Sequence, residues 1–351
     1  MQSRRVTMTD VARAAGVSPM TVSYTYNQPD RVSDGSRAKV LRAAAELGYG
    51  GPDPKARSLR YGATRTLGVV LGEHLTYAFD DPQAVAFLAG VAEVCAERGY
   101  GLLIVPTGTG DDHADRVLAA AVDAYVVWTT TDDDPVLAAA CGTRRPVVVH
   151  SGPAWPGTTV IGIDNRAAAR AVGAVVFAGA RRPAVLGFPL DRRRATFVEP
   201  GVDPATVGYP VTRDRLAGYR DAAAALGIDW SGVPVGVCRT NDEGEARTVL
   251  RELLAAVPDL DAVAAMSDQL ALAVVREAPG VRVSGWDDSA AAREHDLTTV
   301  AQSLRDQGAA CAAAALGDPT PDHRDAWHLV RRASTDGAGS TRPRGARRTS
   351  S

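Results

Sequence analysis

The N-terminal stretch contains the start and end signals of two short helices joined by a tight turn. Thr9 is a good N-cap for a first helix, and Gly16 ends that helix. Ser18 can cap a second helix, with Pro19 at its first position, where the missing N–H costs nothing. Because only Gly16 and Val17 separate the two helices, the chain has to turn sharply there. The stretch therefore predicts a helix-turn-helix.

The second of these helices has two distinct faces. Val22 and Tyr26 lie four residues apart and are expected to pack inward against the first helix. Met20 and Tyr24 are also four residues apart, and they lie on another face that is free to meet a partner. The alternative interpretation is that Met20 and Tyr24 are hydrophobic packing as well.

A third helix completes a small core. Ser33 caps it, and Gly48 stands in the usual C-terminal position. Its expected buried stripe consists of Val40, Leu41, Ala44 and Leu47. Any one of these pieces also fits an ordinary helical hairpin, but three short helices in this order can close one compact domain.

The net charge of −2 is the sum of three regions of the 351-residue chain that differ strongly in charge. Residues 1–65 hold 11 Lys and Arg against 5 Asp and Glu, residues 66–330 hold 22 against 35, and residues 331–351 hold 6 against 1. The three nets are +6, −13 and +5. A basic head on an acidic body attracts a polyanion at one place only, which favours nucleic acid as the partner of the head.

From Thr66 the pattern alternates between short apolar runs and helical periods. The expected strands are Leu67–Leu71, Gly101–Val105, Ala124–Trp128, Pro146–Val149, Val160–Ile163, Ala184–Phe188, Val233–Val237, Ala262–Met266 and Val281–Ser284. The expected helices are Gln83–Arg98, His113–Ala121, Pro135–Cys141, Arg166–Phe177, Arg215–Leu226, Glu243–Ala256, Gln269–Glu277 and Leu304–Leu316.

This alternation predicts doubly wound parallel sheets, and its restart after Ile163 fits two similar α/β lobes better than one large sheet. Ligands of such folds bind at the carboxyl ends of the strands, which in a two-lobed body means the cleft between the lobes. We expect Leu304–Leu316 to cross back to the first lobe. The residues from Ala333 onward, rich in Gly, Ser, Thr and Arg, are expected to form a disordered basic tail without a coiled coil.

Several motifs together carry a family resemblance. They are VTMTDVARAAGVSPMTVS at residues 6–23, then Asn27, Val32-Ser33, Leu47-Gly48-Tyr49 and Pro54-Lys55-Ala56-Arg57-Ser58-Leu59. This stretch resembles the head of the lactose-repressor and galactose-repressor (LacI/GalR) family, and the resemblance continues more loosely to about Val330. It implies an α/β protein with a helix-turn-helix DNA-binding domain (residues 1–53) and a hinge helix and linker (54–65). A two-lobe body like the periplasmic binding proteins (66–332) and the tail (333–351) follow.

The resemblance also assigns roles in the head. Pro19, Met20 and Tyr24 match the positions that read bases, although Arg often stands at the place of Tyr24. Tyr cannot make the bidentate Arg–guanine contact, but it can donate one hydrogen bond or pack on a thymine methyl. The positions that match phosphate contacts are Thr7, Ser18, Thr21, Ser23, Asn27, Ser33, Ser36 and Tyr49. Small hydroxyls at helix starts are also ordinary caps.

The segment after the head matches the family's hinge helix, which orders on DNA. Ala56 and Arg57 correspond to the hinge, and Leu59 to the residue that wedges into the minor groove. The sequence departs from the common pattern by an extra glycine at Gly50-Gly51 and by Asp53, where Asn is usual.

In the body, the resemblance points to an effector site. Arg215 matches an Arg that fixes a polar ligand, and Asp287 matches an acid that accepts bonds from ligand hydroxyls. Ser267 and Asp268 match a segment that usually reads Asn-Asp, and His150 ends a strand near a polar ligand contact. Surface ion pairing remains the alternative for Arg215 and Asp287, and a strand-end histidine fits His150 equally well.

The sequence gives little support for a metal site, a disulfide framework or a catalytic site. Cys95, Cys141, Cys238 and Cys311 are far apart and form no C-x-x-C pair, so buried free thiols are favoured over a metal site or disulfides. The sequence holds no Walker loop, nucleophile elbow or H-E-x-x-H motif, and no signal peptide or membrane-spanning run. We therefore expect a cytoplasmic protein that is no enzyme and uses no cofactor or metal.

The resulting expectation is a transcriptional regulator, in the first instance a repressor. It would bind a pseudo-palindromic double-stranded operator as a homodimer, and a small effector, sugar-like by resemblance, would control it from the cleft. Two alternatives stay open: a DNA-binding regulator whose body binds no ligand, which the departures at Gly72 and Ser267 allow, and a solute- or sugar-binding protein.

Overall fold

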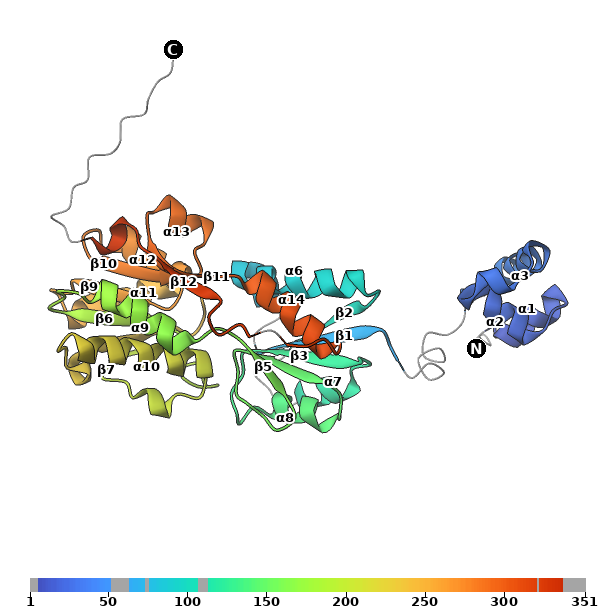
Figure 1. The fold of residues 1–351 in the computed structure, drawn as a ribbon, viewed down its shortest axis with the longest axis horizontal. Coiled ribbons are helices and arrows are strands. Elements are labelled where there is room, and N and C mark those ends of the chain that lie inside the picture. Colours follow the sequence, from blue (N-terminus) through green and yellow to red (C-terminus); the bar gives the residue numbers. More distant parts are fainter. Residues whose placement is uncertain (1–5, 52–62, 73–75, 107–112, 321, 337–351) are drawn as a thin grey trace, which may run out of the picture. The chain divides into compact units, whose positions relative to one another are not determined.

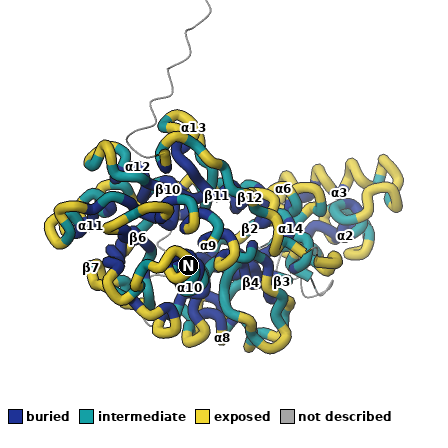
Figure 2. The backbone as a smooth tube through the Cα atoms, turned by 60° about the vertical axis from the view of Figure 1, so that its left-hand side comes forward, coloured by how far each residue is buried: buried dark blue, intermediate teal, exposed yellow. Residues whose placement is uncertain are grey.

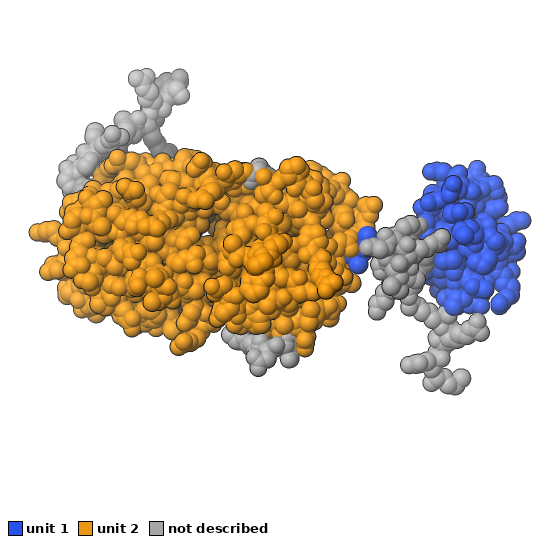
Figure 3. Space-filling model, turned by 60° about the horizontal axis from the view of Figure 1, so that its bottom comes forward, with its two compact units in different colours: residues 1–64 blue, residues 65–351 orange. Residues whose placement is uncertain are grey.

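A computed structural model describes residues 6–51, 63–72, 76–106, 113–320 and 322–336. The chain divides into two compact units, residues 1–64 and residues 65–351 (Figures 1 and 3). The first unit is the helical head and the second is the α/β body, and each is described by itself. No helix in the described ranges is long and apolar enough to cross a membrane.

The head contains helices α1 (Met8–Ala15), α2 (Pro19–Asn27) and α3 (Asp34–Leu47), with a 3-10 turn at Pro29–Arg31. Gly16 and Gly48 end α1 and α3 in the left-handed conformation, as expected of C-terminal glycines. The buried core of the head consists of Val11, Ala12, Val22, Val40, Ala43 and Ala44.

Two details of the head differ from the sequence prediction. The cap of α1 is Thr7 rather than Thr9, because Thr7 and Asp10 form a capping box in which each side chain bonds the other's backbone N–H. The stripe of α3 was predicted correctly only in part: Val40 and Ala44 are buried as expected, but Leu41 and Leu47 are 43% and 39% exposed, and Ala43 is buried instead. The small helices pack closely enough for alanine to fill the interface.

The first lobe of the body is a five-stranded parallel sheet in the order β2-β1-β3-β4-β5. The strands are β1 (Thr66–Leu71), β2 (Gly101–Pro106), β3 (Ala124–Trp128), β4 (Val147–His150) and β5 (Thr159–Ile161). The helices of this part of the chain are α5 (Tyr77–Asp80), α6 (Pro82–Glu97), α7 (His113–Ala119) and α8 (Pro135–Gly142). Figure 2 shows buried strands within more exposed helices.

The second lobe is a seven-stranded sheet in the order β12-β11-β10-β9-β6-β8-β7. Its strands are β6 (Pro183–Gly187), β7 (Phe197–Pro200), β8 (Pro234–Val237), β9 (Ala262–Ala265), β10 (Arg282–Trp286), β11 (Thr298–Gln302) and β12 (Trp327–Val330). Only the edge strands β7 and β12 pair antiparallel. The helices are α9 (Asn165–Val176), α10 (Pro210–Ala225), α11 (Glu243–Ala256), α12 (Asp268–Glu277) and α13 (Ala290–Glu294), with 3-10 turns at Pro204–Thr206 and Trp230–Gly232.

Helix α14 (Leu304–Ala315) returns the chain to the first lobe, as predicted. Leu304, Cys311 and Ala315 belong to the core that also contains Phe87 and Val91 of α6. Figure 1 shows α14 beside α6. Cys95, Cys238 and Cys311 are buried free thiols, whereas Cys141 is only partly buried.

The first residues of the expected disordered tail are ordered, and residues 337–351 lie outside the described residues. Ala333–Thr335 form a 3-10 turn, and Thr335 is buried. The Ser334 hydroxyl donates to Val283 O at 2.7 Å and accepts from Thr298 N at 2.8 Å. Residues 332–336 are therefore part of the body, since these hydrogen bonds attach them to β10 and β11.

Candidate functional site

Helix α2 agrees with the predicted faces at Val22 and Met20, whereas Tyr24 and Tyr26 are both half-buried. Val22 is fully buried in the head, whereas Met20 is 48% exposed. Ser18 caps the helix by accepting from Thr21 N at 3.1 Å, and the Arg31 guanidinium lies 5.5 Å from the ring centre of Tyr24. Met20, in the first turn of α2, is therefore exposed and free to contact a partner.

The residues matched to phosphate contacts fall into three groups. Thr7, Ser18 and Ser33 cap the three helices, so each hydroxyl lies at the positive end of a helix, where an anion is favoured. Ser23 is buried at 5% exposure and offers little surface to a phosphate, and Asn27 donates to its carbonyl at 2.9 Å. The remaining matched residues are Thr21, which shares a bond with Ser18, Ser36, which bonds Ser33, and Tyr49, which packs edge-on against Tyr26. Ala56, Arg57 and Leu59 lie outside the described residues.

A cavity of about 850 Å³, which includes space open to solvent, lies between the two lobes of the body. We call it the interlobe cavity. Most of its walls are strand ends and the residues that follow them. The lining residues used below are Trp128, His150, Asn165, Phe188, Arg215, Asn241, Asp287 and Gln302. This is the location that the doubly wound fold predicts for a ligand.

Arg215 on α10 is the buried cation of this cavity, at 6% exposure. Its Nε donates to Asn165 Oδ1 at 2.9 Å, and Nη1 donates to the carbonyl of Met266. The guanidinium lies 3.7 Å from the ring centre of Trp286, which fixes its plane. Burial lowers the pKa of Arg215 to about 10, and the charge of Asp287 opposes that shift. Arg215 therefore stays cationic at neutral pH.

Asp287 follows β10 and is the acidic partner of the cavity. Its Oδ1 accepts from Gln302 Nε2 at 2.8 Å. Burial raises the pKa of Asp287 to about 7, while the nearby guanidinium of Arg215 acts in the opposite direction. No ion pair within 4.0 Å joins Arg215 to Asp287 in the described part of the chain. Donor and acceptor thus line one cavity without neutralising each other directly.

A chain of amide hydrogen bonds links Asp287 to His150 of the first lobe. Gln307 Nε2 donates to Gln302 Oε1 at 3.1 Å, and Gln307 Oε1 lies 2.9 Å from His150 Nε2. His150 is 3% exposed and packs near the rings of Phe87 and Trp128. Burial lowers its pKa to about 4, so the imidazole is neutral at pH 7. In this arrangement Nε2 carries the proton, and the buried Nδ1 has no hydrogen-bond partner.

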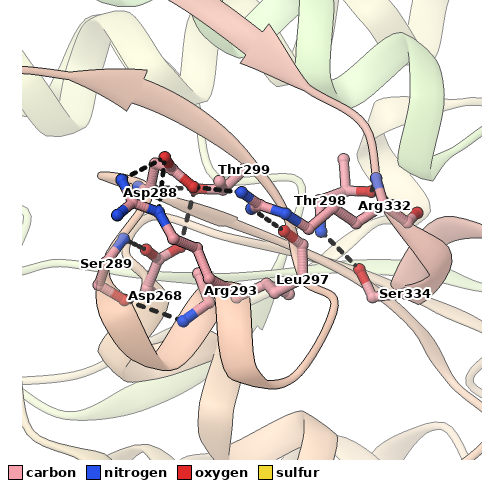
Figure 4. Close-up of polar contacts among 10 residues, drawn as sticks. Asp268, Asp288, Ser289, Arg293, Leu297, Thr298, Thr299, Arg332 and Ser334 are labelled. Atoms are coloured by element: carbon pink, nitrogen blue, oxygen red, sulfur yellow. Dashed lines mark hydrogen bonds and ion pairs between the residues drawn. The ribbon is translucent and has the colours of Figure 1, made fainter. Parts of the chain in front are cut away.

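Ser267 and Asp268 are not among the residues that line the interlobe cavity, although Asp268 lines a second cavity together with Gln83 and Asp287. The Ser267 hydroxyl caps α12 and donates to Asn241 Oδ1 at 2.6 Å. Asp268 is 2% exposed, and its two oxygens accept from Thr299 Oγ1 at 2.8 Å and from Ser289 N at 2.7 Å (Figure 4). Both side chains are occupied in holding the second lobe together.

Asn241 is a site residue that the sequence did not indicate. It follows β8, lines the interlobe cavity, and donates to Asp81 Oδ2 at 2.6 Å. Asp81 caps α6 in the first lobe. Asn165 and Gln302 were also missed, although Gln302 ends β11 and Asn165 and Asn241 lie within four residues after β5 and β8, a position at the carboxyl ends of strands that could have indicated them. Among the described residues there is no group of three or more His, Cys, Asp or Glu side chains that could hold a metal ion.

The architecture defines a class: a helix-turn-helix head followed by a two-lobed α/β body with a polar cavity is a DNA-binding transcriptional regulator. The family model for bacterial regulatory proteins of the lacI family matches residues 7–51. The model for periplasmic binding proteins and the sugar-binding domain of the LacI family matches residues 64–294. The chain belongs to the LacI family, as its head motifs predicted.

Individual relatives agree with this assignment. An HTH-type transcriptional regulator of Mycobacterium tuberculosis is 37% identical over 318 residues, covering 87% of this chain and 89% of the relative. The solved complex of the transcriptional regulator CelR with cellobiose is 28% identical, with a TM-score of 0.62 over 94% of this chain and all of that one. The lac repressor dimer bound to operator and an anti-inducer shares the fold, at 21% identity and a TM-score of 0.69 over 95% and 99% of the two chains.

Proposed function

We propose that this chain is a cytoplasmic repressor that binds a pseudo-palindromic operator as a homodimer and responds to a sugar-like effector in the interlobe cavity. One observation carries the effector part of this proposal. Arg215 is a fixed, buried fork of donors, and Asp287 is an acceptor in the same cavity that is not paired with it. A polyhydroxylated ligand can accept from the first and donate to the second.

The relatives support this proposal in two ways. The CelR structure is named as a complex with cellobiose, which favours a sugar as the ligand class. The lac repressor structure is named as a dimer bound to operator, which favours twofold symmetry for the DNA complex. In that arrangement two heads occupy successive major-groove half-sites, while the hinge residues Ala56 and Arg57 and the wedge residue Leu59 act in the minor groove between them.

The proposed mechanism is a shift between two conformations of the body. Both lobes contribute to the interlobe cavity, and polar contacts such as Asn241 to Asp81 and Gln307 to Gln302 already cross between them. An effector that binds one arrangement of the lobes more tightly favours that arrangement in proportion to its differential affinity. The dimer would transmit this preference to the hinges and therefore to the operator.

Selection of bound duplexes from a randomised pool tests the DNA part. We expect one pseudo-palindrome with two half-sites, bound with a steep dependence on salt. Thermal shift of the full chain against a panel of mono- and disaccharides, cellobiose included, then tests the effector part. A sugar that raises the melting temperature of the wild type but not of Asp287→Asn supports the cavity. No shift with any sugar, together with a specific operator, favours a regulator whose body binds no ligand.

Tyr24→Ala is expected to relax the base preference at one position of each half-site. A lost contact to one base edge is worth about 1–3 kcal/mol of discrimination. Binding to the selected operator and to its single-base variants measures the change. Tyr24→Phe is the matched control, since it keeps the ring for a thymine methyl and removes only the hydroxyl. An unchanged base-preference profile in both variants would mean that Tyr24 only packs beside Arg31.

Effector affinity is expected to rise with pH through the neutral range. The effector hydroxyl needs the ionised form of Asp287, whose pKa burial raises to about 7. Below that pH the carboxyl is protonated, and affinity falls up to about tenfold for each further pH unit. His150 contributes no change here because its pKa is lowered to about 4. Calorimetric titrations between pH 6 and pH 8 measure the slope, and Asp287→Asn should bind weakly at every pH.

A further inference from the structure

The backbone around Asp287 has an unusual conformation. Asp287 and Asp288 are consecutive residues with positive φ, at 105° and 50°. Residues with a side chain rarely adopt this region, and they persist there only where the surroundings hold them. The two positive φ values set where the Asp287 carboxylate leaves the end of β10. The contacts that hold these two φ values therefore also position the Asp287 carboxylate in the interlobe cavity.

The Asp288 carboxylate is held by two arginines (Figure 4). Arg332 Nη2 donates to its Oδ1 at 2.6 Å, and Arg293 Nη2 donates to its Oδ2 at 2.8 Å. The two cations differ in setting, since the side chain of Arg332 is 17% exposed and that of Arg293 is 65% exposed. An exposed ion pair contributes little, whereas an enclosed one with further hydrogen bonds fixes a geometry.

Arg332 follows β12 and is hydrogen-bonded to the start of β11, the strand next to β10. Its Nη1 donates to Leu297 O at 2.9 Å, and its backbone N–H donates to Thr298 Oγ1 at 2.8 Å. Ser334, two residues further on, bonds both Val283 and Thr298. The segment from Arg332 to Thr335 is thus attached to β10 and β11. Figure 4 shows the guanidinium of Arg332 reaching the carboxylate of Asp288.

The geometry points to Arg332 as a positioning residue for the effector site. We propose that it clasps Asp288 and thereby holds the left-handed backbone that places the Asp287 carboxylate in the interlobe cavity, with Gln302 as its partner. Arg332 does not line that cavity, so it acts only through Asp288. The role of Asp287 as effector ligand rests on the proposed function, but its placement by Arg332 does not.

The opposing view is that Arg332 is only a nearby positive charge. The two views predict opposite signs for one measurement. Removing a cation raises the pKa of a nearby carboxyl through space. Releasing Asp287 from its buried position into water instead lowers its pKa, because burial is what raises it to about 7. The other charged groups that act on Asp287 are Arg215, Asp268 and Asp81, and the described contacts of Arg332 are to Asp288, Leu297 and Thr298 rather than to these three.

The test is a carboxyl ¹³C NMR titration of the full chain without effector, with the Asp287 signal identified from Asp287→Asn. In Arg332→Met the pKa of Asp287 should fall from about 7 toward the ordinary aspartate range. Arg293→Gln is the matched control, since it removes a cation from the same carboxylate of Asp288, and it should leave the pKa unchanged or slightly higher. Arg332→Lys should retain the wild-type value, because the amine can still reach Asp288.

A rise or no change of the Asp287 pKa in Arg332→Met would overturn the positioning role, as would an equal fall in Arg293→Gln. If Arg332→Met does not fold, Arg332→Gln replaces it, since its amide retains hydrogen-bond donors. A crystal structure of the folded variant gives a second readout, in which φ of Asp287 should leave its positive value. If the pKa falls as expected while no sugar binds the wild type, the positioning stands and the proposed effector role of the cavity fails.

Discussion

Gly90→Ala is expected to prevent the body from folding stably. A methyl group at Gly90 of α6 would lie 1.9 Å from the carbonyl oxygen of Arg305 and 2.9 Å from the amide nitrogen of Ala309, both in the backbone of α14. Gly308 of α14 meets α6 in the same way, since a methyl there would lie 2.2 Å from Phe87 O. Backbone atoms cannot rotate aside as a side chain does, so the two helices would have to separate.

The cost should exceed the usual penalty of overpacking, about 1–3 kcal/mol, because an entire helix crossing has to move. Urea unfolding of the full chain measures it. Gly142→Ala is the control in the same lobe: Gly142 ends α8 with nothing within 4 Å of the added methyl. It should be neutral or stabilising by up to about 1 kcal/mol. Equal stability of Gly90→Ala and Gly142→Ala would contradict the tight crossing.

The sequence predicted the elements whose signals are local. Caps and C-terminal glycines located the three helices of the head, although Thr7 took the place expected for Thr9 because it could pair with Asp10. Strands buried on both faces were recognised where they form continuous apolar runs, as β1 and β3 do, but β11 was missed because its sequence TTVAQ is not such a run. The two antiparallel edge strands, β7 and β12, were missed because each is only four residues long and largely half-exposed or exposed.

The sequence predicted those site residues whose place in the cavity depends only on where they stand in their own helix or strand. Arg215, Asp287 and His150 were located in the interlobe cavity as expected. Asn241 and Gln302 were not, because their contacts to Asp81 and Gln307 depend on how two lobes meet. The surroundings of Ser267 and Asp268 could not be predicted for the same reason: whether a strand-end side chain faces a cavity or its own lobe depends on neighbours such as Thr299.

Arg215→Lys is expected to abolish the effector response and leave operator binding without effector unchanged. The substitution keeps the positive charge, so the attraction between this position and Asp287 is largely retained. It removes the planar fork, which in the wild type spans Asn165, the Met266 carbonyl and the face of Trp286. An ammonium offers a single point of contact and cannot stack in that plane, so it cannot hold a ligand oxygen in the same geometry.

Effector affinity should fall roughly 100-fold, equivalent to about 2.7 kcal/mol, as for loss of a buried charged hydrogen bond. Calorimetry measures the affinity, and operator binding with and without the effector measures the response. Arg166→Lys is the matched control: this Arg also makes a two-pronged contact, with Asp221 of α10 at 2.7 and 3.1 Å, but its side chain is 57% exposed and does not line the cavity. Wild-type affinity in Arg215→Lys would show that charge alone suffices at Arg215, whereas a loss in Arg166→Lys of the same size would assign the effect to the packing of α9 on α10.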